Sequence, residues 1–293
     1  MSWAVVLTAP EDQLELLSAL FFEEGALGVE LQDRELLPMP GTAPLPPGLG
    51  RCIAHFTQRE EAVAAAEALR GAGAARVEPP LEIAGRDWTI AWRAHHKPAL
   101  VGPRSWVHPP WEAPRLRAGE VGVAIDPGMA FGTGSHPTTA LCLERLDELL
   151  AERPGADVLD LGTGRGVIAL LAWKLGAARI CGTDNDSTAL QAARQGAELN
   201  GVPAGRIEWR LSADPDDHRE APFGIVIANL LLNTLVELAP GIATKVAAGG
   251  RLVLSGLLAA QAGEVERAYA AQGLSPIARK QRDGWVLVEL SRS

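Results

Sequence analysis

The chain has 293 residues, 47% of them hydrophobic, which allows one large domain or two ordinary domains with buried cores. A formal net charge of −9 disfavours nucleic acid as a partner and favours a basic protein, because nucleic-acid-binding proteins usually carry a basic face. The three cysteines have no metal-ligand or redox spacing, and we find neither a signal-peptide pattern nor an apolar run of about 18 residues. We therefore expect a cytoplasmic protein that does not enter the membrane.

Residues 1–80 predict a small α+β domain. The expected strands cover 4–8, 28–31, 52–56 and 76–83, and the expected helices cover 11–24 and 60–70. This β-α-β-β-α-β order is that of a ferredoxin-like sandwich, in which two helices pack on one face of an antiparallel sheet.

A tryptophan-rich segment at 81–114 is expected to act as a linker. It holds four of the eight tryptophans and three of the six histidines: Trp88, Trp92, Trp106, Trp111, His95, His96 and His108. Large amphipathic rings suit a linker that packs on a neighbouring domain, and they also suit a substrate groove or hinge. The histidines show no ligand spacing with a carboxylate partner, so we assign no metal.

Residues 115–293 alternate strands with helices. The expected strands cover 157–161, 179–183, 207–211, 224–228, 251–255, 276–280 and 285–290, and the helices between them include 166–175 and 187–200. Such alternation predicts a doubly wound, mostly parallel, seven-stranded Rossmann-like α/β sheet. Only four residues separate the last two strands, so that pair should form an antiparallel hairpin at an edge.

The main chemical motif is the run VLDLGTGRG at 158–166, where an apolar strand leads into a glycine turn and then a helix. Glycine permits the tight turn and lets backbone approach a ligand closely. The spacing is G-x-G-x-G, with Asp160 two positions before Gly162 and with Gly164 following, whereas dinucleotide sites use G-x-G-x-x-G. An acid at Asp160 suits a cofactor with a cationic amino-acid end and no phosphate, which describes S-adenosylmethionine.

Two further strand ends carry polar side chains. Asp184 follows Gly162 by 22 residues and can accept hydrogen bonds from both ribose hydroxyls, while Asp186 is expected to cap the next helix. Asn229 ends another strand at the edge where ligands of this fold bind. Leucines occupy 230–232, where DNA amino-methylating enzymes carry prolines and a base-stacking aromatic residue, and this argues against a nucleobase substrate.

The segment 126–139 reads DPGMAFGTGSHPTT and closely resembles the signature loop of the methyltransferases that act on ribosomal protein L11 of the large subunit. The linker agrees at the following positions: Arg86, Asp87, Trp88, Trp92, His96, Lys97, Pro98, Trp106 and Trp111. The resemblance covers nearly the whole chain, weakly over 1–80 and strongly over 86–256. It implies a class I S-adenosylmethionine-dependent methyltransferase whose ferredoxin-like domain docks the ribosomal protein. It also implies repeated methylation of lysine side chains and of an N-terminal amine.

Matching positions imply that Thr139, Gly162, Asp184 and Asn229 contact S-adenosylmethionine, while Thr163 stands where that family has a cysteine.

The loop itself is glycine-rich, and Phe131 gives it an apolar tip that could close over a bound cofactor. Pro137 suits the first turn of a helix at 137–152. For His136 we favour a structural or capping role over that of a catalytic base.

Methylation of an amine requires a neutral nitrogen. At pH 7 neutralisation costs about 1 kcal/mol for an α-amino group and about 4.6 kcal/mol for a lysine. Burial beside a sulfonium lowers the amine pKa, so a strong base is not required, and we expect Asn229 to orient the amine or the cofactor's amino-acid end. Two alternatives stay open: a methyltransferase acting on another protein or a small amine, and a non-catalytic module that binds the cofactor. We expect the protein to be a monomer.

Overall fold

A computed structural model describes residues 2–26, 28–32, 45–46, 48–71, 76–83, 97–126, 136–212 and 222–293. The chain divides into two compact units, an N-terminal unit at Met1–His95 and a C-terminal unit at His96–Ser293. Each unit has its own hydrophobic core. In the described part of the chain, no helix is long and apolar enough to cross a membrane.

The N-terminal unit is a ferredoxin-like sandwich, as predicted. Its elements are β1 (Ser2–Pro10), α1 (Leu14–Glu23), β2 (Gly28–Gln32), β3 (Leu49–Phe56), α2 (Arg59–Gly71), β4 (Arg76–Val77) and β5 (Leu81–Ile83). The sheet order is β2-β3-β1, with β4 and β5 both antiparallel to β1. The single strand expected at 76–83 is therefore two short strands. Pro79 and Pro80 separate them, because proline has no N–H to donate to a sheet.

The C-terminal unit begins with a small three-stranded sheet, followed by a long helix. The strands are β6 (Ala99–Leu100), β7 (Ser105–His108) and β8 (Val121–Ala124), and the helix is α4 (Pro137–Glu152). Val107 and Val123 belong to the same core as α4, and the Asn200 side chain pairs with both the N–H and the carbonyl of Ala124. Strands β6 and β7 of the tryptophan-rich segment therefore belong to this unit, whereas its first residues, 81–83, form β5 of the N-terminal unit. Trp88, Trp92, His95 and His96 lie outside the described residues.

The main sheet confirms the doubly wound prediction. Its strands are β9 (Val158–Leu161), β10 (Ile180–Asp184), β11 (Glu208–Leu211), β12 (Phe223–Asn229), β13 (Val246–Leu258), β14 (Leu274–Arg282) and β15 (Trp285–Arg292). The order is β11-β10-β9-β12-β13-β15-β14, and all pairs are parallel except β13–β15 and β14–β15. The predicted antiparallel hairpin is thus confirmed.

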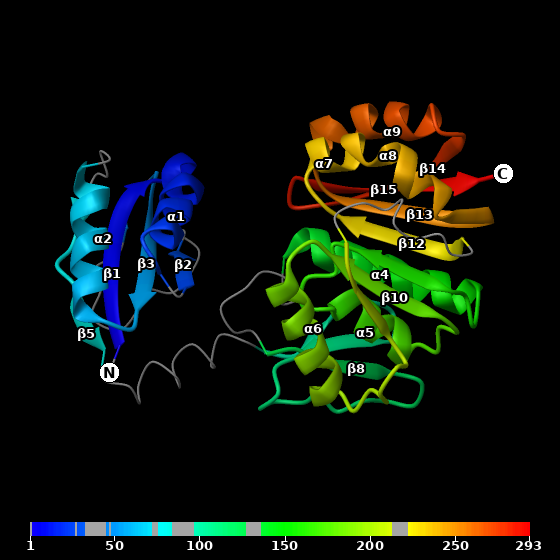
Figure 1. The fold of residues 1–293 in the computed structure, drawn as a ribbon, viewed down its shortest axis with the longest axis horizontal. Coiled ribbons are helices and arrows are strands. Elements are labelled where there is room, and N and C mark those ends of the chain that lie inside the picture. Colours follow the sequence, from blue (N-terminus) through cyan, green and yellow to red (C-terminus); the bar gives the residue numbers. More distant parts are fainter. Residues whose placement is uncertain are drawn as a thin grey trace. The chain divides into compact units, whose positions relative to one another are not determined.

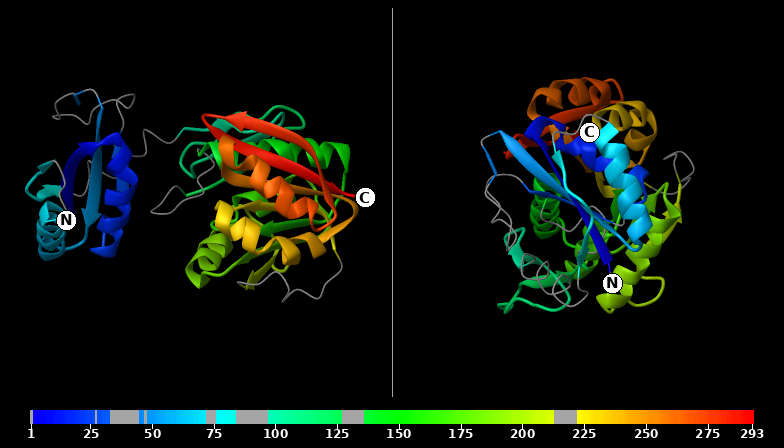
Figure 2. Two further views of the ribbon diagram at one scale, coloured as in Figure 1. Left: turned by 90° about the horizontal axis from the view of Figure 1, so that it is seen from above. Right: turned by 90° about the vertical axis from the view of Figure 1, so that its left-hand side faces the viewer.

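Helices cover both faces of this sheet (Figures 1 and 2). They are α4, α5 (Val167–Lys174) and α6 (Ser187–Leu199) on one face, and α7 (Leu232–Glu237), α8 (Ala239–Thr244) and α9 (Ala262–Ala270) on the other. Alternate strand residues point to opposite cores: Val158 packs with the α4–α6 side and Leu159 with the α7–α9 side. This burial on both faces explains the nearly continuous apolar runs of the sequence.

Candidate cofactor and amine site

The polar strand ends meet where the chain changes direction across the sheet. From β9 the chain adds β10 and β11 on one side and then returns to place β12 on the other side of β9. Asp160, Asp184 and Asn229 lie at the carboxyl ends of these neighbouring strands, β9, β10 and β12. In open α/β sheets ligands bind at such a switch point, so the fold itself places these three side chains at the expected site.

The glycine turn after β9 has a backbone that favours glycine. Gly162 and Gly164 have φ values of +69° and +53°, a region that other residues rarely adopt. A Cβ on Gly162 would come within 2.4 Å of Leu230 Cδ2, so this glycine also makes room for the chain after β12. A Cβ on Gly164 would meet no described atom within 4 Å. One side of the turn is therefore packed, and the other faces open space at the edge of the sheet.

Asp184 ties this turn to the second strand. Its carboxylate accepts hydrogen bonds from Gly164 N–H (2.9 Å) and Asp186 N–H (3.0 Å). Each carboxylate oxygen keeps a further lone pair. Asp186 caps α6 by accepting from Thr188 N–H at 2.7 Å, so the predicted capping role is confirmed. The Asp184 carboxylate is thus held in place and can still accept hydroxyl hydrogens from a ligand.

Asp160 is a fully buried carboxyl group beside the turn. Its Oδ2 accepts from Thr163 Oγ1 (2.5 Å) and from Ala169 N–H (3.3 Å), while its Oδ1 has no hydrogen-bond partner among the described residues. Burial raises the pKa of Asp160 to about 7, and the nearby Asp184 charge adds to this, although the two hydrogen bonds oppose it. A buried carboxyl group with an unpartnered oxygen fits a cationic ligand, which would favour its ionised form.

On the other side of the turn, Asn229 contacts the first turn of α4. The Asn229 amide donates to Thr138 Oγ1 and Thr139 Oγ1, both at 3.3 Å. The amide nitrogen is therefore engaged. Within the described residues, Asn229 Oδ1 receives no hydrogen bond. This carbonyl oxygen is the group that could accept a hydrogen bond from an incoming amine.

His136 begins α4 and confirms the capping role that we favoured from sequence. Its Nδ1 accepts from Thr138 N–H at 3.3 Å and lies 2.7 Å from Thr138 Oγ1. The ring packs edge-on against Trp285, with 5.0 Å between the ring centroids. Because Nδ1 is engaged with α4, the neutral ring would carry its proton on Nε2. His136 thus positions the threonines that hold Asn229.

The structure brings together most of the residues predicted from sequence. They are Thr139, Asp160, Gly162, Gly164, Asp184 and Asn229. Phe131 lies outside the described residues. Sequence reasoning missed Thr163 as the donor to Asp160, Thr138 as a second partner of Asn229, and Trp209, whose ring lies against Gly182 and Gly166. Trp209 carried no signal beyond its place in an edge strand. Among the described residues no group of three or more His, Cys, Asp or Glu side chains could hold a metal ion.

The sheet order, the acid and glycine turn at the end of β9 and the second acid at the end of β10 define a class I S-adenosylmethionine-dependent methyltransferase. The sequence profile described as ribosomal protein L11 methyltransferase (PrmA) matches residues 2–293. The chain therefore belongs to the ribosomal protein L11 methyltransferase family.

Individual relatives agree with this family over nearly the full length. The chain is 40% identical to the ribosomal protein L11 methyltransferase of Myxococcus xanthus, covering 99% of this chain and 98% of that protein. It is 41% identical to the protein of that name from Azotobacter vinelandii, covering 99% of each. The crystal structure of a ribosomal protein L11 methylase from Lactobacillus delbrueckii subsp. bulgaricus superposes with a TM-score of 0.60 at 26% identity, covering 68% of this chain and 98% of that one.

Proposed function

We propose that this protein transfers methyl groups from S-adenosylmethionine to amine nitrogens of ribosomal protein L11, namely lysine side chains and the N-terminal α-amine. The observation that carries the proposal is the buried Asp160 carboxyl, with one unpartnered oxygen, at the switch point beside Asp184 and Asn229. The names of relatives about 40% identical over nearly the full length support the choice of substrate. Methylation of a ribosomal protein would take place in the cytoplasm.

Each strand-end residue would contact a different part of the cofactor. Asp160 would bind the cationic amino-acid end, and Asp184 would accept the ribose hydroxyls. Gly162 and Gly164 would let the backbone approach the ligand, and Thr139 would line the same edge. We also propose Phe131, which lies outside the described residues, as an apolar contact of the cofactor. S-adenosylmethionine supplies an electrophilic methyl group on a positively charged sulfur.

For the amine, the protein's task is to orient it and to favour its neutral form. Asn229 Oδ1 can accept one N–H while the threonines hold its amide group, so the nitrogen lone pair can be directed away from Asn229. A nearby positive charge and partial burial both lower the pKa of an amine. Alignment of the nitrogen with the methyl group then supplies much of the rate. No strong base is required in this scheme, which agrees with the capping role of His136.

We further propose a division of labour along the chain. Residues 1–80 would recognise the ribosomal protein, 81–114 would link the domains, and 115–293 would carry out methyl transfer. Residues 1–95 carry 14 acidic and 7 basic side chains, so most of the net charge of −9 lies in the N-terminal unit. That balance suits a basic protein partner. Removal of 1–80 should abolish methylation of the ribosomal protein while cofactor binding remains.

The test is intact-mass measurement of L11 after incubation with the protein and S-adenosylmethionine, followed by mapping of the modified nitrogens. We expect mass increases in whole methyl steps, located on lysine side chains and the α-amine. The Asn229→Ala variant is measured in parallel, because loss of the amine-orienting side chain should slow the increase in mass. Cofactor binding without any increase in mass would leave methylation of another protein or a small amine, or a non-catalytic role, and would refute L11 as the substrate.

A further inference from the structure

Thr163 lies inside the glycine turn, and its backbone is fixed on both sides. Its N–H donates to the Thr183 carbonyl of β10 at 2.8 Å, and its own carbonyl accepts from Gly166 N–H at 2.8 Å. The residue is 6% exposed. A Cβ on Gly182 of β10 would lie 2.9 Å from Thr163 Oγ1, so the neighbouring strand has a glycine at the point where the hydroxyl group lies. The fold therefore determines the position of this hydroxyl group.

Two donors converge on the same oxygen of Asp160. Thr163 Oγ1 donates to Oδ2 at 2.5 Å, and Ala169 N–H donates to Oδ2 at 3.3 Å. Oδ1 has no hydrogen-bond partner among the described residues. Because Oδ2 already accepts two hydrogen bonds, a proton on the neutral carboxyl group is expected on Oδ1. That proton and a cationic ligand would therefore compete for the same oxygen.

The two donors differ in what a substitution can change. Ala169 lies in the first turn of α5, and the residue before this helix, Gly166, provides no side-chain cap. The Ala169 N–H is a backbone group, so it remains available to Asp160 whichever side chain occupies position 163. The Thr163 hydroxyl group makes the shorter of the two bonds, and a single substitution removes it.

Two titratable groups face Asp160 from neighbouring elements. Burial is the main cause of the raised Asp160 pKa, and the negative charge of Asp184 on β10 adds to it. Cys142 of α4 is fully buried, and burial raises the pKa of its thiol to about 12, so the thiol stays neutral up to pH 9. On β12 the residue in register with Asp160 is the apolar Ile227. Neither Cys142 nor Ile227 brings a charge to the carboxyl group in this range.

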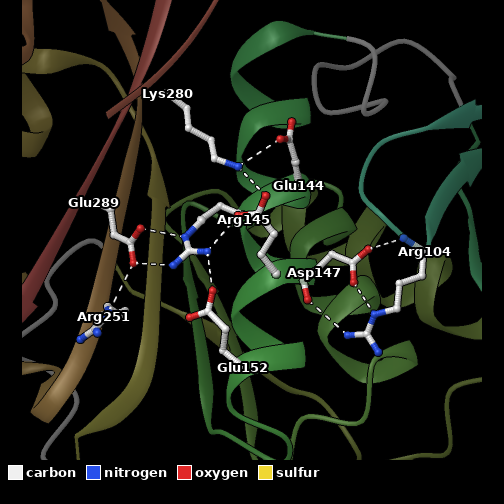
Figure 3. Close-up of polar contacts among 9 residues, drawn as sticks. Arg104, Glu144, Arg145, Asp147, Glu152, Arg251, Lys280 and Glu289 are labelled. Atoms are coloured by element: carbon white, nitrogen blue, oxygen red, sulfur yellow. Dashed lines mark hydrogen bonds and ion pairs between the residues drawn. The ribbon is translucent and has the colours of Figure 1, made fainter. Parts of the chain in front are cut away.

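The charged side chains of α4 make ion pairs with β14, β15 and the segment before β7 (Figure 3). The pairs are Arg145 with Glu289, Lys280 with Glu144 and Glu148, and Asp147 with Arg104. These contacts hold the helix in place while its charges are engaged with other elements. The helix therefore presents the neutral Cys142 to Asp160.

We propose that Thr163 is a positioning residue for the cofactor: its hydroxyl group leaves Asp160 Oδ1 for the cationic amino-acid end and favours the ionised carboxylate that this end requires. The inference rests on the proposed function, in which Asp160 binds that end of the cofactor. A hydrogen bond donated to a carboxylate stabilises its charged form. Without the hydroxyl group, more of the protein would carry the competing proton at neutral pH, and the cofactor would bind more weakly.

The expected effect depends on pH. Loss of a hydrogen bond to a charged group should raise the proton affinity of Asp160 about 10- to 150-fold. Since the pKa of Asp160 is already raised to about 7, the ionised fraction at pH 7.5 would fall about 3- to 40-fold. At pH 9 the same change lowers the ionised fraction about threefold or less. A distorted turn would instead weaken binding equally at both pH values.

The test is calorimetric titration at pH 7.5 and pH 9 with the demethylated product of S-adenosylmethionine. This probe keeps the amino-acid end and lacks the sulfonium charge, and its own amine titrates identically with every variant. Thr163→Val removes the hydroxyl group and keeps the branched side chain, whereas Thr163→Ser keeps the hydroxyl group. Thr244→Val is the matched control, because Thr244 Oγ1 donates at 2.7 Å to the Gly241 carbonyl in α8, on the other face of the sheet.

For Thr163→Val we expect an affinity about 3- to 40-fold below that of the wild type at pH 7.5, narrowing to about threefold or less at pH 9. Thr163→Ser should bind within about twofold of the wild type, and Thr244→Val should match the wild type at both pH values. If Thr163→Val does not fold, Thr163→Cys takes its place, because a thiol is a weak donor and should give a smaller loss with the same pH dependence.

Equal affinities of the wild type and Thr163→Val at pH 7.5, or a loss of the same size at both pH values, would overturn the inference. Full affinity in Asp160→Asn would remove the assignment of Asp160 and this inference with it. A wild type that binds the nucleoside with the expected pH dependence but does not methylate L11 would contradict the proposed substrate alone.

Discussion

Replacing Asp160 by asparagine should change the stability and the cofactor affinity of the protein in opposite directions. The carboxyl is fully buried, and burial raises its pKa from 3.8 to about 7. Since the folded-state pKa exceeds the unfolded value, the stabilisation that this group supplies is complete below the unfolded pKa. It is lost as pH rises through about 7. Above that pH the ionised carboxyl group destabilises the ligand-free folded state. The ionised form is nevertheless the one that a cationic ligand requires.

The magnitudes follow from proton linkage. Between pH 4.5 and 7.5 the wild type should lose about 3 kcal/mol of stability relative to Asp160→Asn, because only the wild type must ionise a buried group. Below about pH 7 the Asp160 carboxyl group is mostly protonated, so the cationic cofactor must displace its proton in order to bind. Affinity of the wild type for S-adenosylmethionine should therefore be about 25-fold weaker at pH 5.5 than at pH 7.5. The asparagine variant loses a charged hydrogen bond worth about 1.5–3 kcal/mol, so it should bind about 10- to 150-fold more weakly at pH 7.5.

Urea unfolding of the ligand-free proteins at the two pH values measures the first effect, and calorimetric titration measures the second. Asp157→Asn is the control: Asp157 precedes β9 at the opposite end of the strand, where it pairs with Arg179, so its loss should leave cofactor affinity unchanged. A wild-type affinity that stays level from pH 5.5 to 7.5, or full affinity in Asp160→Asn, would refute the reasoning.

Three further predictions concern the same site and its partner. Gly164→Ala places a methyl group in open space at a φ of +53°, so we expect a loss of about 1 kcal/mol in unfolding free energy and at least tenfold weaker cofactor binding. Gly201→Ala, with a φ of +70° and equally open surroundings, should show the same loss of stability and normal cofactor affinity in paired calorimetric titrations. Asn229→Ala should lower kcat about 2- to 13-fold in a methyl-transfer assay through loss of an orienting hydrogen bond worth about 0.5–1.5 kcal/mol, and unchanged kcat together with unchanged cofactor affinity would exclude that role. The kcat/KM for L11 should fall as salt rises from 50 to 500 mM, which shortens the Debye length from about 14 Å to about 4 Å, because the acidic N-terminal unit would attract a basic substrate; a salt-independent value would contradict that attraction.

Local patterns were sufficient to predict the fold. Apolar runs separated by helical spacing predicted the alternation of β9 to β15 with helices, and a four-residue connection predicted the terminal hairpin. The details that failed depend on tertiary contacts. The two prolines that split the strand expected at 76–83 were visible in the sequence, but their effect depends on pairing with β1. The contact of β7 with α4 includes the bond of Asp147 to Arg104, 43 positions earlier in the chain, and no local pattern indicates such a contact.

The site residues show the same difference between features that a local sequence pattern predicts and features that depend on tertiary contacts. Asp160, Asp184 and Asn229 were predictable because each ends an apolar strand, and parallel strands bring their carboxyl ends to one edge. The partners of these residues were not predictable. Thr138 meets Asn229 across 91 positions, and only the folded chain shows that one Asp160 oxygen is buried without a partner among the described residues. Strand ends can be recognised from sequence, whereas the hydrogen bonds that orient them require the folded chain.

The most direct measurement is calorimetric titration of the folded wild-type protein at pH 7.5 with S-adenosylmethionine and with its demethylated product. We expect one site per chain for each nucleoside, with binding at least tenfold weaker when Gly164 is replaced by alanine and unchanged when Gly201 is replaced. Absence of binding heat for both nucleosides, in a protein whose unfolding transition is cooperative, would contradict a cofactor site at the carboxyl ends of β9, β10 and β12.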